Sequence, residues 1–503
     1  MGAVLATAPG RILVRFSGDI EATAGSIRLY DATGKLVPLG TVVHPDGERA
    51  AASAAPLSPL ADGGYLVSYQ VLSADGHNVR GAFSFQVGTG GAAPSSDLLD
   101  RLSNTPPGES ALRFIGGIGR FAVFLGTAVG FGLLALCALL WPGGRNDRRV
   151  RSIITVALAL ATLGAVVQLA AAAGGVGGAG LSGITSAVAW RSFTRTGVGL
   201  WWVARTVLLA VGCVAAWFAL SRSGAARWRL GYGALALALF FTMAKSGHGT
   251  TGRWIGFGLA LTVVHLAAVS TWVGGLFGLA LVALGRPEGR AVATRFSRVA
   301  LCSAITVVAT GLAQAWRQLP TWADLRDGSY GHTLTTKTVL VLTLIGAGWL
   351  SRLLVQRPDE ATLRLRDVVG METLLATGIL LVTTGLVNLP PIPLRPPQPV
   401  NVTLTSSGRL ADIILEPAAV GPNTVHLTVT NASGEVAKPD SMLVRLTPPT
   451  QDIGPVSSPP SLARANHATF ADLVLPHSGE WRLEILVQFG AEQVRFSAPV
   501  KIR

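Results

Sequence analysis

The pattern of apolar and polar positions divides the chain into three regions. In the first, residues 1 to about 90, apolar and polar side chains alternate in short runs separated by glycine-containing turns. The strand-like runs cover residues 12–16, 26–30, 65–69 and 82–87. Short alternating strands at this spacing predict a small β-sandwich over residues 1–90. A Gly-, Ala-, Pro- and Ser-rich stretch follows and predicts a linker over residues 91–112.

The middle region contains long apolar runs. A membrane with a hydrocarbon core of about 30 Å requires about 20 apolar residues per spanning helix. Eight runs approach that length, which predicts a transmembrane domain over residues 113–392. The predicted helices cover residues 114–141, 152–174, 197–221, 230–247, 255–284, 299–318, 334–351 and 371–390.

The last region, residues 393–503, returns to alternation after a proline cluster that ends the final helix. Strand-like segments such as Val425–Val429 and Trp481–Val487 predict a second β-sandwich. The predicted fold class is therefore mixed. It consists of an eight-helix, all-α transmembrane bundle flanked by two extracytoplasmic β-sandwich domains.

Charge supports the membrane interpretation and predicts an orientation. Only 14% of the residues are charged, compared with about 25% in soluble proteins. The net charge is +14, and arginines concentrate in the connections after the first, third, fifth and seventh predicted helices. Positive residues favour the cytoplasmic side, so these connections are predicted to be cytoplasmic. We expect a multi-pass protein of the cytoplasmic (inner) membrane with both termini extracytoplasmic, and no binding of nucleic acid.

Several chemistries are disfavoured by missing motifs. The three cysteines lie in apolar runs without CxxC spacing, which argues against a disulfide framework or a zinc site. The sequence contains no P-loop, no CxxCH haem motif, no HExxH and no GxSxG. We therefore expect no enzymatic activity.

His265 is the first candidate site residue. It lies ten residues into the fifth predicted helix, which places it about 15 Å deep. Ionisable side chains at that depth are costly and often functional. His265 is either a metal ligand or a neutral histidine hydrogen-bonded to a neighbouring helix.

Three further candidates lie toward the outer side of the predicted bundle. His248 lies between the fourth and fifth helices, and Met243 precedes it by about one turn. A thioether and an imidazole together suit Cu(I), although a methionine on a lipid-facing helix is normally apolar filler. His332, in the loop before the seventh predicted helix, could also supply metal or could be a solvated loop residue.

Asp75 and His77 form the candidate site of the N-terminal domain. They are two residues apart and face the same side of an extended chain. A carboxylate oxygen and an imidazole nitrogen suit Cu(II). The alternative is a turn aspartate beside a surface histidine.

The sequence resembles two copper protein families. Residues 10–88 resemble CopC, through Phe16–Gly18, Gly64–Tyr69 and above all Ser73–Phe85. Residues 113–390 resemble CopD, through Ser246–Gly249 and His265–Leu276. The C-terminal region is similar to YtkA/FixH-like domains, mainly through Ser478–Trp481. The resemblance implies copper as the bound metal, with Asp75 and His77 as Cu(II) ligands.

The chain departs from CopC at its start. CopC domains usually begin with a histidine that completes the Cu(II) site, and this chain begins too late to contain it, so the domain is expected to be N-terminally truncated. His44 could then supply a ligand. Residues Met1–Leu13 also lack the pattern of a signal peptide, so either the start lies upstream or the first helix exports the domain.

The expected function is copper binding and transport across the cytoplasmic membrane, in the direction of import. The outer domain would capture copper, and His248 and His265 would relay it. Copper ions and the lipid bilayer are the expected partners, with a periplasmic copper protein as a further candidate. Two alternatives stay open at this point: a copper chaperone or delivery scaffold without transport, and an electron-transfer protein with histidine-ligated haem b.

Overall fold

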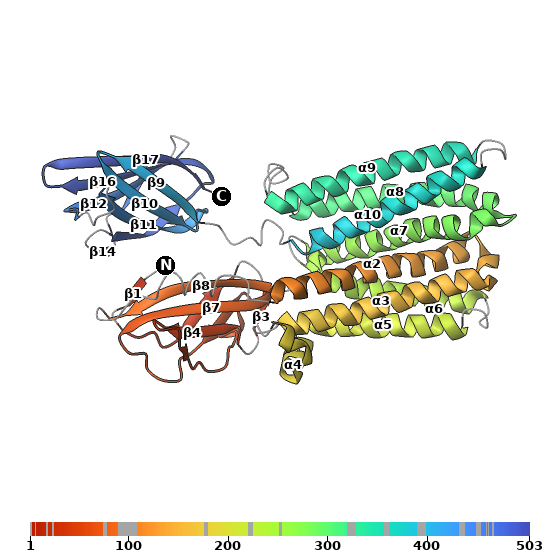
Figure 1. Ribbon diagram of the computed structural model, residues 1–503, viewed down its shortest axis with the longest axis horizontal. Helices are drawn as coiled ribbons and strands as arrows, with labels where there is room; N and C mark the ends of the chain where they lie inside the picture. The colour runs from red at the N-terminus through yellow and green to blue at the C-terminus, as the bar shows by residue number, and fades with distance from the viewer. Residues whose placement is uncertain are drawn as a thin grey trace. The chain divides into compact units, whose positions relative to one another are not determined.

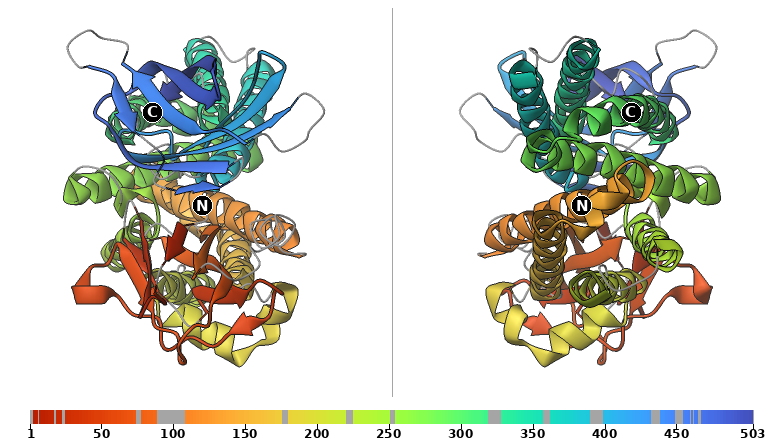
Figure 2. Two further views of the ribbon diagram at one scale, coloured as in Figure 1. Left: turned by 90° about the vertical axis from the view of Figure 1, so that its left-hand side faces the viewer. Right: turned by 90° about the vertical axis from the view of Figure 1, so that its right-hand side faces the viewer.

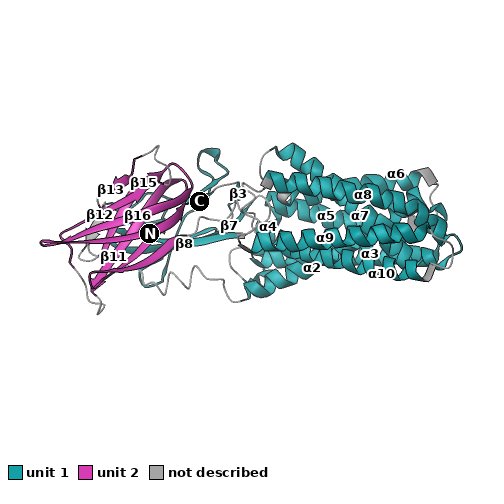
Figure 3. Cartoon of the chain, turned by 90° about the horizontal axis from the view of Figure 1, so that it is seen from above, with its two compact units in different colours: residues 1–394 teal, residues 395–503 magenta. Residues whose placement is uncertain are grey.

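A computed structural model gives the fold of the chain and divides it into two compact units, Met1–Leu394 and Arg395–Arg503 (Figure 3). The residues it describes are 3–5, 7–16, 19–22, 25–73, 78–88, 108–175, 180–219, 225–250, 254–318, 328–356, 362–389, 399–431, 438–448, 454–458, 460, 462–464 and 467–502. Asp75 and His77 lie outside these residues.

The first unit opens with two sheets. The strands are β1 (Ala3–Leu5), β2 (Ile12–Arg15), β3 (Ile20–Glu21), β4 (Ile27–Asp31), β5 (Leu36–Val37), β6 (Ala51–Ala54), β7 (Gly63–Ser73) and β8 (Asn78–Val87). A six-stranded sheet has the order β1-β8-β7-β4-β5, with β3 paired to β7, and β2 pairs with β6. Residues from both sheets, such as Val14 and Leu29, share one apolar cluster, because alternate side chains point to the same side.

Helices form the rest of the first unit (Figures 1 and 2). They are α2 (Glu109–Leu139), α3 (Arg148–Gly175), α4 (Ala187–Thr194), α5 (Gly197–Ala219), α6 (Ala225–Lys245), α7 (Ile255–Leu281), α8 (Gly289–Gln318), α9 (Gly328–Val355) and α10 (Thr362–Val387). Short 3₁₀ turns connect some of them, among them η5 (His248–Thr250).

Among the described residues, seven of these helices are long and apolar enough to cross a membrane, where the sequence predicted eight. The two helices outside that set are α4, whose eight residues are too few to span a membrane, and α6, with 21 residues. Arg227 and Arg229 lie near its start and Lys245 is its last residue. Any 18-residue stretch of α6 includes Arg229, which lowers its mean hydropathy. The bundle is flanked by β-sheet regions on both sides in the sequence, as predicted.

Helices α5 and α7 begin where the sequence predicted, but the other spanning helices begin earlier than their apolar runs indicated. Helix α8 starts at Gly289, ten residues before the predicted 299–318, and α10 starts at Thr362 instead of 371. His332, predicted in a loop, lies in the second turn of α9. The apolar run marks only the part of a helix that lies in hydrocarbon, whereas its polar turns continue beyond it.

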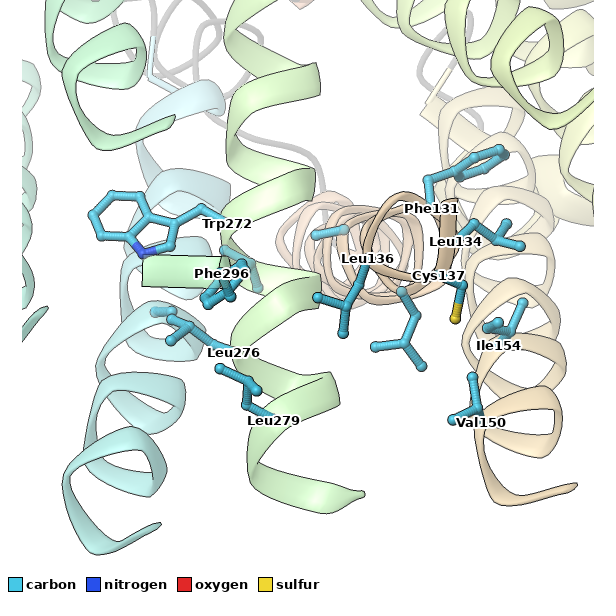
Figure 4. Close-up of a cluster of buried hydrophobic side chains, with 14 of the residues drawn as sticks. Phe131, Leu134, Leu136, Cys137, Val150, Ile154, Trp272, Leu276, Leu279 and Phe296 are labelled. Carbon is cyan, nitrogen blue, oxygen red and sulfur yellow. The ribbon is translucent and has the colours of Figure 1, made fainter. Parts of the chain in front are cut away.

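The centre of the bundle is a glycine-lined crossing of α2 and α7. A methyl group on Gly132 would overlap the Ser270 carbonyl oxygen and would lie 2.6 Å from the Gly274 Cα. Leu133 and Leu136 of α2 and Leu276 and Leu279 of α7 belong to the buried cluster around this crossing (Figure 4). Small residues allow two helix backbones to approach this closely.

The described residues of the four arginine-rich connections lie at one end of the bundle. Arg286, after α7, forms an ion pair with Asp147, after α2. Arg145 stacks over Trp228 at the start of α6. Arg352 of α9 donates to the Ser297 carbonyl of α8. The connections that the charge pattern assigned to the same side of the membrane are therefore together in the structure.

The second unit contains two sheets around its own core. Its strands are β9 (Val400–Ser406), β10 (Arg409–Glu416), β11 (Gly421–Asn431), β12 (Ser441–Thr447), β13 (Val456–Ser458), β14 (Leu462–Arg464), β15 (His467–Leu475), β16 (Gly479–Phe489) and β17 (Glu492–Ile502). One sheet has the order β14-β15-β11-β10-β9 and the other β13-β12-β16-β17. Phe470 and Trp481, one from each sheet, are buried in a shared cluster.

An ion pair in this unit predicts acid sensitivity. His426 Nε2 lies 3.4 Å from Glu416 Oε1. The hydrogen bond with His426 holds the pKa of Glu416 at about 2, below its ordinary 4.5, although burial acts in the opposite direction. A folded-state pKa below the unfolded value stabilises the fold above about pH 4.5, and the contribution is lost as the pH falls toward 2.

We therefore expect Glu416→Gln to destabilise residues 395–503 at pH 7 by about 1–3 kcal/mol. The difference from the wild type should shrink as the pH falls from 5 to 2. Residues 395–503 have their own core, so thermal unfolding of this segment at several pH values measures the destabilisation and its dependence on pH. Equal melting temperatures of the wild type and Glu416→Gln at pH 7 would show that the contact with His426 does not stabilise the fold. Glu480→Gln, at an exposed position, is the control.

Candidate metal site

His265 lies between two helices near the middle of α7. Its Nδ1 is 2.8 Å from the Thr310 hydroxyl of α8. That hydroxyl also lies 2.6 Å from the Thr306 carbonyl oxygen, which can only accept a hydrogen bond. The Thr310 proton is therefore committed to the helix backbone, and the hydroxyl accepts from His265 Nδ1–H.

This hydrogen bond fixes the tautomer of the neutral ring. With the proton on Nδ1, the lone pair is on Nε2. A neutral imidazole that donates one N–H to a neighbour and presents the other nitrogen is the usual form of a metal-binding histidine. The two sequence-based alternatives thus coincide, since His265 is hydrogen-bonded to a neighbouring helix and retains a nitrogen that can bind metal.

A polar stripe connects His265 to the outer end of α7 and α8. On α7 it contains Gly258, Thr262 and His265, and on α8 it contains Thr310, Gln314 and Arg317. Both sets have the spacing i, i+4, i+7, which places each on one helix face. A side chain on Gly258 would overlap the Arg317 guanidinium, so the two faces meet there.

Thr310 and Gln314 were not predicted from the sequence to lie near His265. Their spacing was visible in the sequence. However, an amphipathic pattern does not show which neighbouring helix a face packs against. Lys337 of α9 lies within electrostatic range of the His265 ring.

The η5 turn brings the backbone around His248 to this stripe. A side chain on Gly249 would contact the Thr262 hydroxyl at 3.1 Å and the Gly258 carbonyl oxygen at 3.5 Å. The side chain of His248 lies outside the described part of the chain. Met243 is 8% exposed and belongs to the buried apolar cluster, the environment expected of a packing residue. Its role as a ligand stays a prediction.

The remaining candidates have separate environments. His332 is exposed on α9. His44 is half-buried, and its Nδ1 bonds to the Ala51 carbonyl, which leaves Nε2 as its possible ligand atom. Among the residues that the structure describes, no group of three or more His, Cys, Asp and Glu is placed to hold a metal ion.

The N-terminal domain is docked on the end of the bundle opposite the arginine-rich end. Arg80 of β8 forms an ion pair with Glu109 at the start of α2. Gln70 of β7 donates to the Gly175 carbonyl at the end of α3, at 3.0 Å. Leu72 packs against the cluster that includes Trp202. Figure 1 shows the β7–β8 hairpin reaching the helices. In the sequence, Asp75 and His77 fall between these two strands.

The Arg80–Glu109 pair predicts a measurable effect on this docking. The two side chains are 19% and 11% exposed, so each loses much of its hydration. Arg80→Glu should destabilise the docked state by about 1–3 kcal/mol, a value between the contributions of exposed and of buried ion pairs. Adding Glu109→Arg should restore it. Hydrogen exchange of β7 and β8 reports the change, and unaltered exchange in the single variant would show that the pair does not hold the domain.

The inner end of the bundle contains a small cavity. It has a volume of about 110 Å³, and Trp272, Phe296, Trp349 and Glu372 are among its lining residues. The Glu372 carboxylate is 2% exposed and accepts a hydrogen bond from Ser351 of α9. Arg364 and Arg366, in the first turns of the same helix, are both exposed.

Comparison with known proteins identifies the class. A CopC domain matches residues 1–88, a copper resistance protein D-like N-terminal domain matches residues 117–256, and copper resistance protein D matches residues 290–386. The chain therefore belongs to the copper resistance proteins that join a CopC domain to a CopD membrane domain. It is a copper-handling, multi-pass membrane protein, and copper is its metal.

The chain is also similar to individual proteins. The chain is 24% identical over 458 residues to the copper transport protein CutJ of Bacillus subtilis, which covers 86% of this chain and 81% of that protein. CopC from Methylosinus trichosporium OB3b is 33% identical over 17% of this chain and 82% of its own, with a TM-score of 0.16. The copper resistance protein PcoC from Escherichia coli is 24% identical over 17% of this chain and 91% of its own, with a TM-score of 0.15.

Proposed function

We propose that the protein carries copper inward across the cytoplasmic membrane. The observation that carries this proposal is the His265 ring, held by Thr310 so that Nε2 is available about 15 Å along α7. The polar stripe extends outward from that ring to the Gly249 turn. Copper captured by Asp75 and His77 would pass to His248 and then to His265.

The orientation follows from the two ends of the bundle. The arginine-rich connections gather at one end, which the positive-inside rule favours as cytoplasmic. The N-terminal domain contacts the opposite end, through Glu109 and Gly175. We propose that α6 also spans the membrane, which gives eight crossings and places both termini outside. The C-terminal unit is then a second extracytoplasmic domain, of the YtkA/FixH-like type.

The described helices offer the haem alternative no second histidine at the depth of His265. A bis-histidine haem requires two histidines at similar depth on facing helices. Helices α2 to α10 contain two histidines, His265 and His332. His265 lies about 15 Å from the first residue of α7, and His332 lies about 6 Å from the first residue of α9, so the two histidines differ in depth.

The delivery-scaffold alternative shares every feature of the copper site and differs only in the absence of net transport.

Copper accumulation tests the proposal. Cells without their own copper uptake system would express the wild type, His265→Ala or His248→Ala at matched membrane levels. We expect the wild type to raise cell copper and both variants to fall to the level of cells with an empty vector. His477→Ala, exposed in the C-terminal unit, is the matched control and should behave as the wild type. A wild type indistinguishable from the empty vector would exclude transport and favour delivery.

A further inference from the structure

Glu372 is a buried carboxylate that the relay from His248 to His265 does not use. Helices α7, α8 and α9 contain no aspartate or glutamate, and Asp367, the other carboxylate of α10, is exposed. Among the described residues, Glu372 has one hydrogen-bond partner, the Ser351 hydroxyl of α9, and no cation within ion-pair distance. An ionisable group buried in a spanning helix without an opposite charge is costly and often functional.

The cavity beside Glu372 lies on the same face of α7 as His265. Trp272, which lines the cavity, follows His265 by seven residues, and Leu276 and Leu279 line it one and two turns further inward (Figure 4). Seven residues correspond to about 10 Å along a helix. The helix face that presents the histidine therefore reaches the cavity about 10 Å further inward.

Helix α8 shows the same continuity. A side chain on Gly311 would lie 3.9 Å from the His265 Cε1 atom, so this face of α8 is against the ring. Ala304 and Ser297 precede Gly311 by 7 and 14 residues, and both line the cavity. Positions seven apart share one helix face. The His265 ring and the cavity that Glu372 lines thus lie along one interface between α7 and α8.

The cavity is large enough for a metal ion but offers it few ligands. Its volume of about 110 Å³ admits several water molecules. Its walls are mostly apolar, with Trp272, Phe296 and Trp349 among them, so a cation there loses hydration and gains little in exchange. Among the lining residues, only Glu372 carries a carboxylate. Compensation of a positive charge in the cavity therefore depends on Glu372.

Arg352 of α9 also lines the cavity, and its Nη1 donates to the Ser297 carbonyl and hydroxyl at 3.3 Å. A guanidinium donates hydrogen bonds and cannot bind a cation. The other titratable side chains near the inner end are exposed or lie against other groups: Arg290, Arg295, Arg298 and Cys302 of α8, Cys137 of α2, and Arg364, Arg366 and Asp367 of α10. Those in the outer halves of α2, α7, α8 and α9 are Glu109, Arg113, Arg120, His265, Arg317, Tyr330, His332 and Lys337.

We infer that Glu372 exchanges its proton for copper in this cavity, and so receives the ion that moves inward from His265. Without metal the side chain is the neutral carboxylic acid, because a buried charge without a partner is costly. When copper arrives, the O–H bond of Glu372 breaks, the proton leaves to water at the inner end, and a copper–oxygen bond forms. The oxidation state of copper is unchanged, and the carboxylate takes up a proton again when copper leaves. This inference rests on the proposed transport function, since it names the group that receives the substrate.

The first test follows the proton and needs no transport. Infrared difference spectra of the detergent-solubilised full chain are recorded before and after addition of copper(I). The wild type should lose the carbonyl band of a protonated carboxyl group. Glu372→Gln, which keeps an acceptor for the Ser351 hydroxyl, should show no such loss. Asp367→Asn, at the exposed carboxylate of the same helix, is the matched control and should show the wild-type change. Identical difference spectra of the wild type and Glu372→Gln would overturn the inference.

The second test is the initial rate of copper entry into liposomes that contain equal amounts of each protein. Glu372→Gln should lower this rate by about tenfold or more, because an opposite charge within a few ångströms of the ion is lost. Glu372→Asp keeps the carboxylate and should retain most of the rate, which separates charge from packing. Entry through Glu372→Gln at the wild-type rate would also contradict the inference. If the wild type carried no more copper than protein-free liposomes, the transport proposal would fail, and the infrared result would still decide whether Glu372 receives copper.

Discussion

Gly274→Leu is expected to abolish the yield of folded protein in the membrane. The backbones of α2 and α7 meet at Gly274 and Gly132, where a methyl group on Gly274 would lie 2.6 Å from the Ala128 carbonyl oxygen. The atoms it would strike belong to the backbone and cannot rotate away. Overpacking of an interior by a few methylene groups costs about 1–3 kcal/mol, and separating two helices forfeits their shared contacts as well.

A matched substitution isolates the crossing as the cause. Gly346 of α9 is exposed, and a side chain there would meet nothing within 4 Å. Gly346→Leu adds the same volume to a spanning helix and should leave the yield unchanged. Size-exclusion chromatography of the solubilised wild type, Gly274→Leu and Gly346→Leu proteins compares their yields of folded protein. A monodisperse Gly274→Leu protein with the thermal stability of the wild type would show that α2 and α7 do not approach as described.

The fold was largely predictable because each region has a distinct period. Alternation located β2, β4, β7 and β8, and each observed strand overlaps its predicted segment. Apolar runs located the helices, but their length reports hydrocarbon thickness, so α8 and α10 begin about nine or ten residues earlier than predicted. The short α4 helix was not predicted, because eight residues give too little periodicity to distinguish a helix from a loop.

The candidate site was predictable only in part. A histidine deep in an apolar run is conspicuous, and so His265 was identified. Its partner Thr310 is one of many threonines in the helices, and most of these bond to their own helix backbone. Only the packing of α7 on α8 distinguishes it. The docking of the N-terminal domain through Arg80 and Glu109 is likewise a long-range contact, which no local pattern contains.

The inner and outer halves of α7 contribute differently to the site. Its inner half contains Gly274, Gly275 and Gly278 and is fixed against α2 and α8. Its outer half presents Gly258, Thr262 and His265 to α8, where backbone bonds of Thr262 and Thr310 satisfy the hydroxyls. A rigidly packed inner half therefore sets the position of the histidine, and α8 sets the direction of its ring.

Thr310→Val is expected to lower copper affinity and transport by about 10–100-fold, the usual effect of removing the partner of a metal-binding histidine. Valine has nearly the same shape and cannot accept the hydrogen bond from His265 Nδ1–H. Without that acceptor the ring can rotate or place its proton on Nε2, and the ligand atom is lost for part of the time. Thr310 is therefore a positioning residue that acts through His265.

Thr310→Ser separates this role from helix packing. Serine keeps the hydroxyl and loses the methyl group, so copper affinity should return close to the wild-type value, whereas a packing defect would persist. Thr306→Val is the control one turn away, because the Thr306 hydroxyl bonds to the Cys302 carbonyl and its loss should not alter copper binding. Competition with a copper chelator measures the affinity of each purified protein. If Thr310→Val bound copper as tightly as the wild type, the hydrogen bond would not orient the ligand, and the assignment of Nε2 as the metal-binding atom would lose its basis.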